Sequence, residues 1–176
     1  MKIIASISLL CCILACNKAT PQKTVAVTVL NTNLISSRYA PSFFNELQEM
    51  KRNDRINVYK NDEMGKGTAE EYVQQNAILP IKDALKKVED LVVTDDASEM
   101  RTASIELLSY SKTIFEKDFI NIAIMIDSNQ PQLTIDSAIQ QMYKTHDTEL
   151  DKRFRVLDEL AIPYAEKNNV PLTFNK

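Results

Sequence analysis

Scarcity of glycine is the feature that most constrains the fold of this chain. Only two glycines, Gly65 and Gly67, occur among the 176 residues, and both lie in one polar stretch. Folds built from many strands use glycine in the tight turns that join the strands. Leucine, isoleucine, alanine, lysine, glutamate and glutamine are abundant instead, and these residues favour helices. The composition therefore predicts an all-α fold rather than a β-sandwich or a barrel.

Apolar residues recur at intervals of three and four in four segments, which is the spacing of amphipathic helices. We predict helices over residues 24–51, 68–92 and 96–127, and a fourth helix that begins at residue 131 or 134 and continues at least to Pro163. The first contains a proline and is expected to kink or break near residues 39–41, because proline removes a hydrogen bond and clashes with the preceding turn. Four such segments, with short turns between the last three, predict an antiparallel four-helix bundle.

Two helix starts carry a capping signal. Thr68 and Glu71 have the spacing of a capping box, in which the hydroxyl and the carboxylate each accept a hydrogen bond from a free backbone N–H. Asp96 and Glu99 form a similar pair, and their negative charges suit the positive end of a helix. These pairs predict where the second and third helices begin.

Prolines and asparagines mark the interior and the end of the later helices. Pro80 is expected to bend the second helix, and Pro163 to bend or end the fourth. Residues 168–169 are both asparagine and can supply a left-handed C-cap. Residues 170–174 are predicted to form a short extended tail.

Two segments need a choice between structures. Residues 25–29 could form a strand because of their β-branched content. We predict a helix there, since the sequence shows no second strand pattern and a lone strand is not stable. Residues 52–67 are polar and contain both glycines, so they predict the longest loop of the chain.

The first sixteen residues predict export. Lys2 is followed by an apolar run from Ile3 to Leu14 and then by Ala15 and Cys16. A basic start, an apolar stretch of about 7–15 residues and a small residue before the cleavage point are typical of a signal peptide. The run is too short to span a bilayer, which takes about 20 apolar residues.

The segment Ile13–Cys16 resembles the bacterial lipobox. That resemblance implies cleavage before Cys16, diacylation of its thiol and acylation of the new amino group. The alternative is an ordinary signal peptide that is cut near Ala15 or Ala19. The predicted organisation is a signal peptide over residues 1–15, a lipidated tether over residues 16–23 and a helical bundle domain over residues 24–176.

The charge and cysteine content of the processed chain limit its chemistry. Processing would leave 20 basic residues, which is 21 less Lys2, against 24 acidic ones, so the net charge would be about −4. The sequence has no run of lysine or arginine, so nucleic acid is not a predicted partner. Cys11 and Cys12 would be removed and Cys16 would carry lipid, so no disulfide could form and the fold must rest on its apolar core.

Two stretches carry a family resemblance. Residues 107–119, which run Leu-Leu-Ser-Tyr-Ser-Lys-Thr-Ile-Phe-Glu-Lys-Asp-Phe, resemble a recurring part of small helical lipoproteins of Bacteroidetes-type bacteria. The same holds for Leu150-Asp-x-x-Phe154 followed by residues 164–168. The resemblance covers about residues 95–170 and implies a four-helix bundle behind a lipobox. The resemblance supplies no catalytic residue. It is also imperfect, because Pro163 falls at a position where these proteins usually remain helical.

His146 is the only histidine, and it falls on the apolar stripe of the fourth helix near Asp147 and Glu149. A buried histidine beside a carboxylate could bind a metal or sense pH. The interpretation that we favour is a hydrogen-bonded histidine in the core or at its boundary. A di-iron bundle needs Glu-x-x-His, and Tyr143 occupies the position of that glutamate.

Other catalytic patterns are absent from the sequence. It contains no Gly-x-Ser-x-Gly and no Cys-x-x-Cys-His, and Gly65-Lys-Gly67 lacks the spacing of a phosphate-binding loop. Glu116-Lys-Asp118 is interpreted as a solvated helix face with local ion pairs. We therefore predict that the protein is not an enzyme and that it has no catalytic residue, no cofactor and no metal site.

These patterns predict a lipid-anchored protein of the bacterial cell envelope that binds another envelope protein without catalysis. The prediction rests on the anchor at Cys16, on the missing catalytic set and on the long loop over residues 52–67. Asn17 follows the lipidated cysteine where aspartate would favour the inner membrane in some bacteria, so we predict the outer membrane. The alternative function is a helical bundle that holds a small apolar molecule among its tyrosines and phenylalanines, or a metal near His146.

Overall fold

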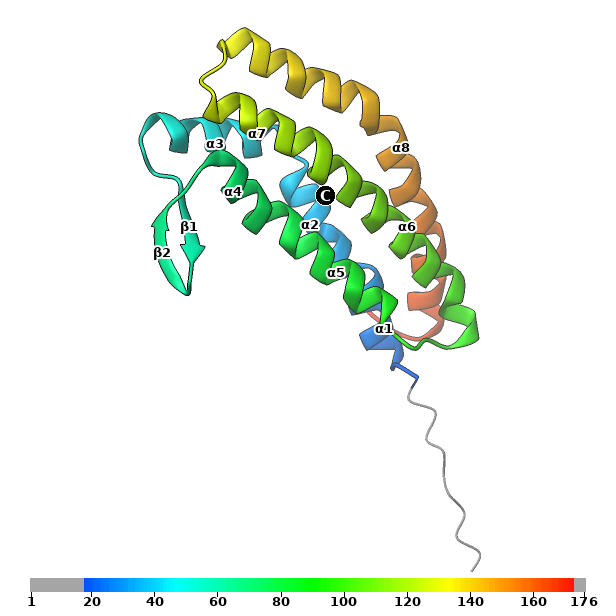
Figure 1. Ribbon diagram of the computed structural model, residues 1–176. Helices are drawn as coiled ribbons and strands as arrows, with labels where there is room; N and C mark the ends of the chain where they lie inside the picture. Colours follow the sequence, from blue (N-terminus) through cyan, green and yellow to red (C-terminus); the bar gives the residue numbers. More distant parts are fainter. Residues whose placement is uncertain (1–17, 173–176) are drawn as a thin grey trace, which may run out of the picture.

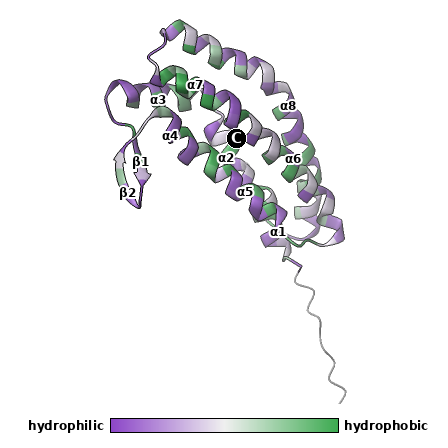
Figure 2. Cartoon of the chain, viewed as in Figure 1, coloured by the Kyte–Doolittle hydropathy of each residue, from purple (hydrophilic) through white to green (hydrophobic). Residues whose placement is uncertain are grey.

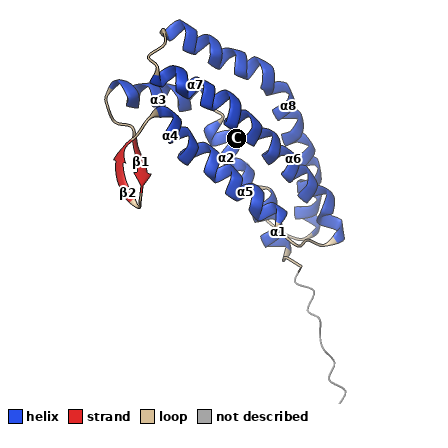
Figure 3. Cartoon of the chain, in the orientation of Figure 1, coloured by secondary structure: helices blue, strands red, loops and turns tan. Residues whose placement is uncertain are grey.

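The computed structural model describes residues 18–172, which are mostly helical (Figures 1 and 3). The described residues form five helical segments and one two-stranded hairpin, in the order α1 (Pro21–Thr28), α2 (Asn33–Arg38), α3 (Pro41–Arg52), β1 (Asn57–Lys60), β2 (Glu63–Lys66), α4 (Ala69–Val73), α5 (Leu79–Glu89), α6 (Ser98–Ile114), α7 (Ile120–Asp127) and α8 (Gln132–Lys167). The pairs α1–α2, α4–α5 and α6–α7 each make one segment. The predicted signal peptide and Cys16 lie outside the described residues.

Helix α1 begins three residues before the predicted position, inside the segment predicted as a tether. The Thr20 hydroxyl accepts a hydrogen bond from the Lys23 amide at 3.3 Å, and Pro21 occupies the first helical position. Proline suits that position because its missing N–H would have no partner there. Residues 25–28 are helical, as predicted, rather than extended.

Pro41 breaks the first predicted helix completely. Helix α2 ends at Arg38, and Pro41 starts α3 after an extended Ala40 with φ −129° and ψ 144°. The predicted first helix is therefore two helical segments in the structure, α1–α2 and α3. The described chain has five helical segments where the sequence predicted four.

A β-hairpin replaces part of the predicted loop. Strands β1 and β2 pair antiparallel, with Lys60 opposite Glu63, and only Asn61 and Asp62 join them. Both turn residues have positive φ, 53° and 66°. Two residues in this conformation form a type I′ turn, whose twist matches that of the paired strands. The prediction that the sequence holds no strand pair was wrong.

Asp127 and Thr68 fix the start of the segment that follows the hairpin. The predicted capping box is confirmed, since the Thr68 hydroxyl accepts from the Glu71 amide and the Glu71 carboxylate accepts from the Thr68 amide. The Asp127 carboxylate, at the end of α7, accepts from the amides of Ala69 at 2.9 Å and Glu70 at 3.0 Å. It also pairs with Lys51 of α3 at 3.1 Å.

The environment of Asp127 favours its charged form. Burial alone would raise the pKa of its carboxyl, but the two amide hydrogen bonds and Lys51 outweigh burial, and the pKa is lowered. One carboxylate thus joins α3, α4 and α7 at the base of the hairpin.

Two π-helical turns interrupt the long segments. Gln74–Ile78 separates α4 from α5, and Phe115–Phe119 separates α6 from α7. The first lies next to Pro80, which lacks the N–H that would bond to the Asn76 carbonyl. That carbonyl accepts a hydrogen bond from Arg38 Nε at 2.7 Å instead. A π turn shifts the facing of the helix that follows it, and such turns are frequent at functional sites.

The apolar core lies where the helices face one another. The largest fully buried side chains are Phe44, Phe115, Phe119, Ile35, Leu47, Ile78, Ile81, Met100, Leu107, Leu108, Ile114 and Ile122. Helix α6 contacts α5 and α8, and α4 packs against α7. Hydrophobic and hydrophilic residues alternate along the long helices (Figure 2). Within residues 18–172, no helix combines the length and the apolar character needed to cross a membrane.

Helix α8 continues through Pro163 and curves along the bundle (Figure 1). Pro163 therefore does not end it. Asn169 has φ 54° and supplies the predicted left-handed C-cap, and the Val170 amide donates to the Ala165 carbonyl at 2.9 Å. Only the first part of the predicted tail, residues 170–172, lies among the described residues.

Candidate functional site

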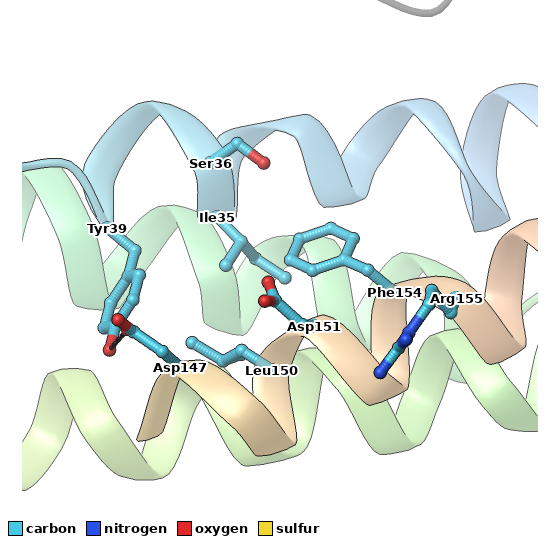
Figure 4. Close-up of a pocket in the computed structure, with 8 residues that line it drawn as sticks. All are labelled: Ile35, Ser36, Tyr39, Asp147, Leu150, Asp151, Phe154 and Arg155. Carbon is cyan, nitrogen blue, oxygen red and sulfur yellow. Dashed lines mark hydrogen bonds between the residues drawn. The ribbon is translucent and has the colours of Figure 1, made fainter. Parts of the chain in front are cut away.

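An open groove of about 490 Å³ runs between α2 and α8 (Figure 4). Its floor is apolar, because Ile35 and Leu150 are buried there. The half-buried rings of Tyr39 and Phe154 flank this floor. The complete lining is Ile35, Ser36, Tyr39, Asp147, Leu150, Asp151, Phe154 and Arg155.

The helical repeat of α8 explains why one helix supplies most of the groove. Residues 150 and 151 lie three and four positions after Asp147, and Phe154 lies a further four and three positions on, so the four residues share one face of α8. Helix α2 ends just before Tyr39, whose ψ of 57° turns the chain out of the helix. The Tyr39 ring then packs against Tyr143 of α8, with centroids 4.9 Å apart in an edge-to-face arrangement.

A tyrosine–aspartate hydrogen bond closes one end of the groove. The Tyr39 hydroxyl donates to Asp147 Oδ1 at 2.8 Å. Burial of the phenol raises the pKa of Tyr39, and the hydrogen bond and negative charge of Asp147 raise it further. The hydroxyl therefore stays protonated at neutral pH and acts as a fixed hydrogen-bond donor. This hydrogen bond occupies only one of the two Asp147 carboxylate oxygens.

Asp151 and Arg155 lie further along the same side of α8. In Figure 4 the Asp151 carboxylate points toward α2 over the apolar floor, whereas the Arg155 guanidinium points away from α2. Within the described part of the chain, neither side chain forms an ion pair or a hydrogen bond. The charge that faces the groove is therefore mainly negative.

His146 takes part in a separate polar cluster on α8. Its Nδ1 lies 2.9 Å from the Tyr110 hydroxyl and its Nε2 lies 3.3 Å from Asp118 Oδ2. The side chain is 17 % exposed, which agrees with the favoured interpretation of a hydrogen-bonded boundary histidine. The sequence neighbours Asp147 and Glu149 do not contact it as carboxylate partners, since Asp147 binds Tyr39 and Glu149 binds an arginine.

Asp118 was interpreted from the sequence as part of a solvated face, and the structure corrects this. It belongs to the π turn Phe115–Phe119 and is half-buried against His146. The Cζ atom of Arg153 lies 4.8 Å from the centroid of the Tyr110 ring, so this arginine also belongs to the cluster. Among residues 18–172 there is no group of three or more histidine, cysteine or acidic side chains that could hold a metal ion.

The hairpin forms a second candidate surface. Tyr59 and Met64 lie opposite each other on β1 and β2 and are 64 % and 58 % exposed. The other face of the hairpin buries Val58 against the bundle. The Gln75 side chain holds the outer edge of β1, since its amide accepts from the Tyr59 N–H at 2.9 Å and donates to the Tyr59 carbonyl at 2.7 Å.

Further contacts fix the hairpin on α4. Lys60 pairs with Glu71 at 2.8 Å. Gly67 lies against Val58 so closely that an added Cβ would come within 2.6 Å of the valine side chain. The sequence predicted a loop over residues 52–67, so it missed this surface. The available signal was the polar pair Asn61-Asp62 between short runs that contain Val58, Tyr59 and Met64.

Comparison of the chain with protein-family models, with curated proteins and with solved structures finds no match.

Proposed function

We propose that this chain is a lipid-anchored protein of the bacterial cell envelope that binds another envelope protein through the outer face of its hairpin, without catalysis. The observation that carries the proposal is the exposed pair Tyr59 and Met64 on a hairpin that the bundle holds in place. Tyrosine and methionine are enriched in protein interfaces, and an exposed apolar patch often marks one.

The fixed position of the hairpin supports a binding role. Gln75 bonds to both backbone groups of Tyr59, and the Lys60–Glu71 pair holds the turn end of β1. A partner would therefore meet a surface that is already ordered. Binding then costs less conformational entropy than it would with a flexible loop.

The first described residues support a position of the hairpin away from the membrane. The Ala19 amide donates to the Val92 carbonyl at 2.7 Å, and Lys18 pairs with Asp95 at 3.0 Å. A lipid on Cys16 would thus hold the α1 end of the bundle close to the bilayer. The hairpin stands at the end away from α1 (Figure 1), where a partner could reach it.

The lipobox over residues 13–16 supports the anchor. The resemblance of residues 95–170 to four-helix-bundle lipoproteins of Bacteroidetes-type bacteria supports the same location. We place the protein at the outer membrane, because Asn17 rather than aspartate follows the lipidated cysteine.

The test is crosslinking in native membranes followed by affinity purification and mass spectrometry. Four chains are compared: wild type, the double variant Tyr59→Ser with Met64→Ser, the control Leu133→Ser, and Cys16→Ser. Leu133 is 81 % exposed at the start of α8, so it controls for the loss of any exposed apolar side chain. We expect one stoichiometric partner with wild type and the control, and its loss with the double variant. A partner that the double variant retains would contradict the hairpin role.

Cys16→Ser tests the anchor separately. We expect this variant to leave the membrane fraction, because two or more acyl chains are needed for stable attachment. Membrane retention of Cys16→Ser would contradict lipidation at this residue.

The groove between α2 and α8 favours a second candidate function, the binding of a small ligand. Its volume of about 490 Å³ falls in the range of about 300–1,000 Å³ that is typical of ligand sites. A few polar groups stand around an apolar floor, which is the usual composition of such sites. The sequence also suggested a metal near His146 as an alternative. At that place His146 and Asp118 are the two side chains that could act as metal ligands.

A further inference from the structure

We infer that the groove between α2 and α8 binds a small organic cation, an ammonium group on a short apolar chain. The inference rests on the second candidate function, ligand binding by the bundle, and is independent of the hairpin. It depends on the apolar floor, on two carboxylates and on two aromatic rings that converge on one space.

The floor supplies the site for the apolar part of the ligand. Ile35 and Leu150 are buried beneath the groove, and the Phe154 ring stands beside them. A short alkyl chain on this floor would remove apolar surface from water, at about 0.8 kcal/mol for each buried methylene. The floor alone does not distinguish a cation from a neutral molecule.

The carboxylates supply that distinction. Asp147 and Asp151 are one helical turn apart on the groove face of α8. Asp147 keeps one oxygen available after it accepts from Tyr39, and Asp151 points toward α2 in Figure 4. A cation between α2 and α8 would meet negative charge, whereas an anion would be repelled by it.

Aromatic rings strengthen the preference for a cation. Tyr39 and Phe154 lie at either side of the floor (Figure 4). A cation over the face of such a ring is attracted by its quadrupole. Arg155 is the only basic residue of the lining, and it points away from α2, so it weakens the negative field without occupying the groove.

The test compares hexylammonium, hexanol and hexanoate, which share one apolar chain and differ in charge. The full chain is titrated with each, and saturation is followed at the backbone amides of Ser36 and Asp151 by NMR. Exposed ion pairs contribute up to about 1 kcal/mol each, which is about fivefold in affinity. We therefore expect hexylammonium to bind about fivefold more tightly than hexanol, and hexanoate to bind most weakly.

Three variants make the result specific. Asp151→Asn should weaken hexylammonium about fivefold and leave hexanol unchanged. Glu159→Gln, an exposed acid on α8 outside the groove, should change neither. Ser36→Trp, which places a large ring at the rim, should abolish the binding of all three probes.

Outcomes of two kinds would overturn the inference, one against cation selection and one against ligand binding. Equal affinity for hexylammonium and hexanol, or no effect of Asp151→Asn, would refute cation selection while leaving ligand binding in place. Absence of any saturable shift would refute the groove as a ligand site. Neither outcome would affect the hairpin proposal, whose variants lie outside the groove.

Discussion

Gly65 and Gly67 provide a matched pair of substitutions that tests how the hairpin is held. The two residues are two positions apart, and neither has a positive φ, so alanine is compatible with both backbones. An alanine Cβ at position 65 would meet no atom within 4 Å. At position 67 it would come within 2.6 and 2.7 Å of the two γ-carbons of Val58.

Gly67→Ala should therefore lower the free energy of unfolding, whereas Gly65→Ala should not. Val58 is buried and its β-branched side chain has little rotational freedom, so the clash must be relieved by moving the hairpin. Such overpacking typically costs about 1–3 kcal/mol, which we expect for Gly67→Ala. Gly65→Ala should be neutral or stabilise by up to about 1 kcal/mol, because alanine lowers the entropy of the unfolded chain.

The assay is urea unfolding followed by circular dichroism, with free energies extrapolated to water. Hydrogen exchange of the Tyr59 amide locates the effect, since that amide bonds to Gln75 only when the hairpin is docked. Gly67→Ala should speed its exchange and Gly65→Ala should not. Equal unfolding free energies for the two variants would refute the packing of Val58 on Gly67.

Asp127→Ala, with Asp90→Ala as its control, tests the helix junction, and Tyr143→Phe tests a half-buried tyrosine. Asp127→Ala should destabilise the fold by about 2–3 kcal/mol, from the loss of a helix cap and of the half-buried pair with Lys51, whereas Asp90→Ala, at an exposed pair, should stay within about 0.5 kcal/mol in the same urea assay. The pKa of Asp127 is lower in the folded protein than its unfolded value of about 3.9. The carboxylate therefore stabilises the fold fully above the unfolded pKa, and this stabilisation is lost as pH falls through the folded pKa. The difference in unfolding free energy between wild type and Asp127→Ala should therefore shrink in acid. Burial, with the nearby charge of Asp147, raises the pKa of Tyr143 to about 12. The free energy of unfolding should therefore fall as pH rises from about 10 to 12, and Tyr143→Phe should reduce that fall. An unchanged alkaline titration at 295 nm in Tyr143→Phe would contradict this prediction.

Several helix ends followed from local sequence signals, but the start of the third predicted helix did not. Helix α6 begins at Ser98, and its N-cap is Ala97 without a side-chain hydrogen bond, so the pair Asp96 and Glu99 does not cap it. The capping box of Thr68 with Glu71, the break at Pro41 and the left-handed Asn169 are confirmed by the structure. Each depends on residues within one or two turns of the chain, so the sequence shows it directly. The helical stripe that contains Phe115 and Phe119 was equally readable, and both side chains are buried.

The hairpin and the π turns were missed for different reasons. Each strand has only four residues, and the turn uses Asn61-Asp62 instead of a pair with glycine, so the strand signal was weak. A π turn leaves no pattern in the sequence, yet the turn at Phe115–Phe119 contains Asp118, the carboxylate that pairs with His146. That pairing could not be found from the spacing of residues on α8.

The groove depends on contacts between segments far apart in the sequence. Tyr39 and Asp147 are 108 positions apart, and their hydrogen bond exists only because α2 lies along α8. The alternative function drawn from the sequence placed a small apolar ligand among the tyrosines and phenylalanines of the bundle. It did not predict that carboxylates would share that space, because their facing depends on how α8 is rotated against α2.

Site-specific photocrosslinking of the full chain tests the proposed hairpin interface most directly. A photoreactive phenylalanine analogue is placed at Tyr59 in one chain and at Leu133 in another, and each is irradiated in native membranes. Both positions are exposed, but only Tyr59 lies on the proposed interface. We predict one discrete crosslinked product from position 59 and none from position 133. Products of equal yield from both positions, or no product from position 59, would contradict it.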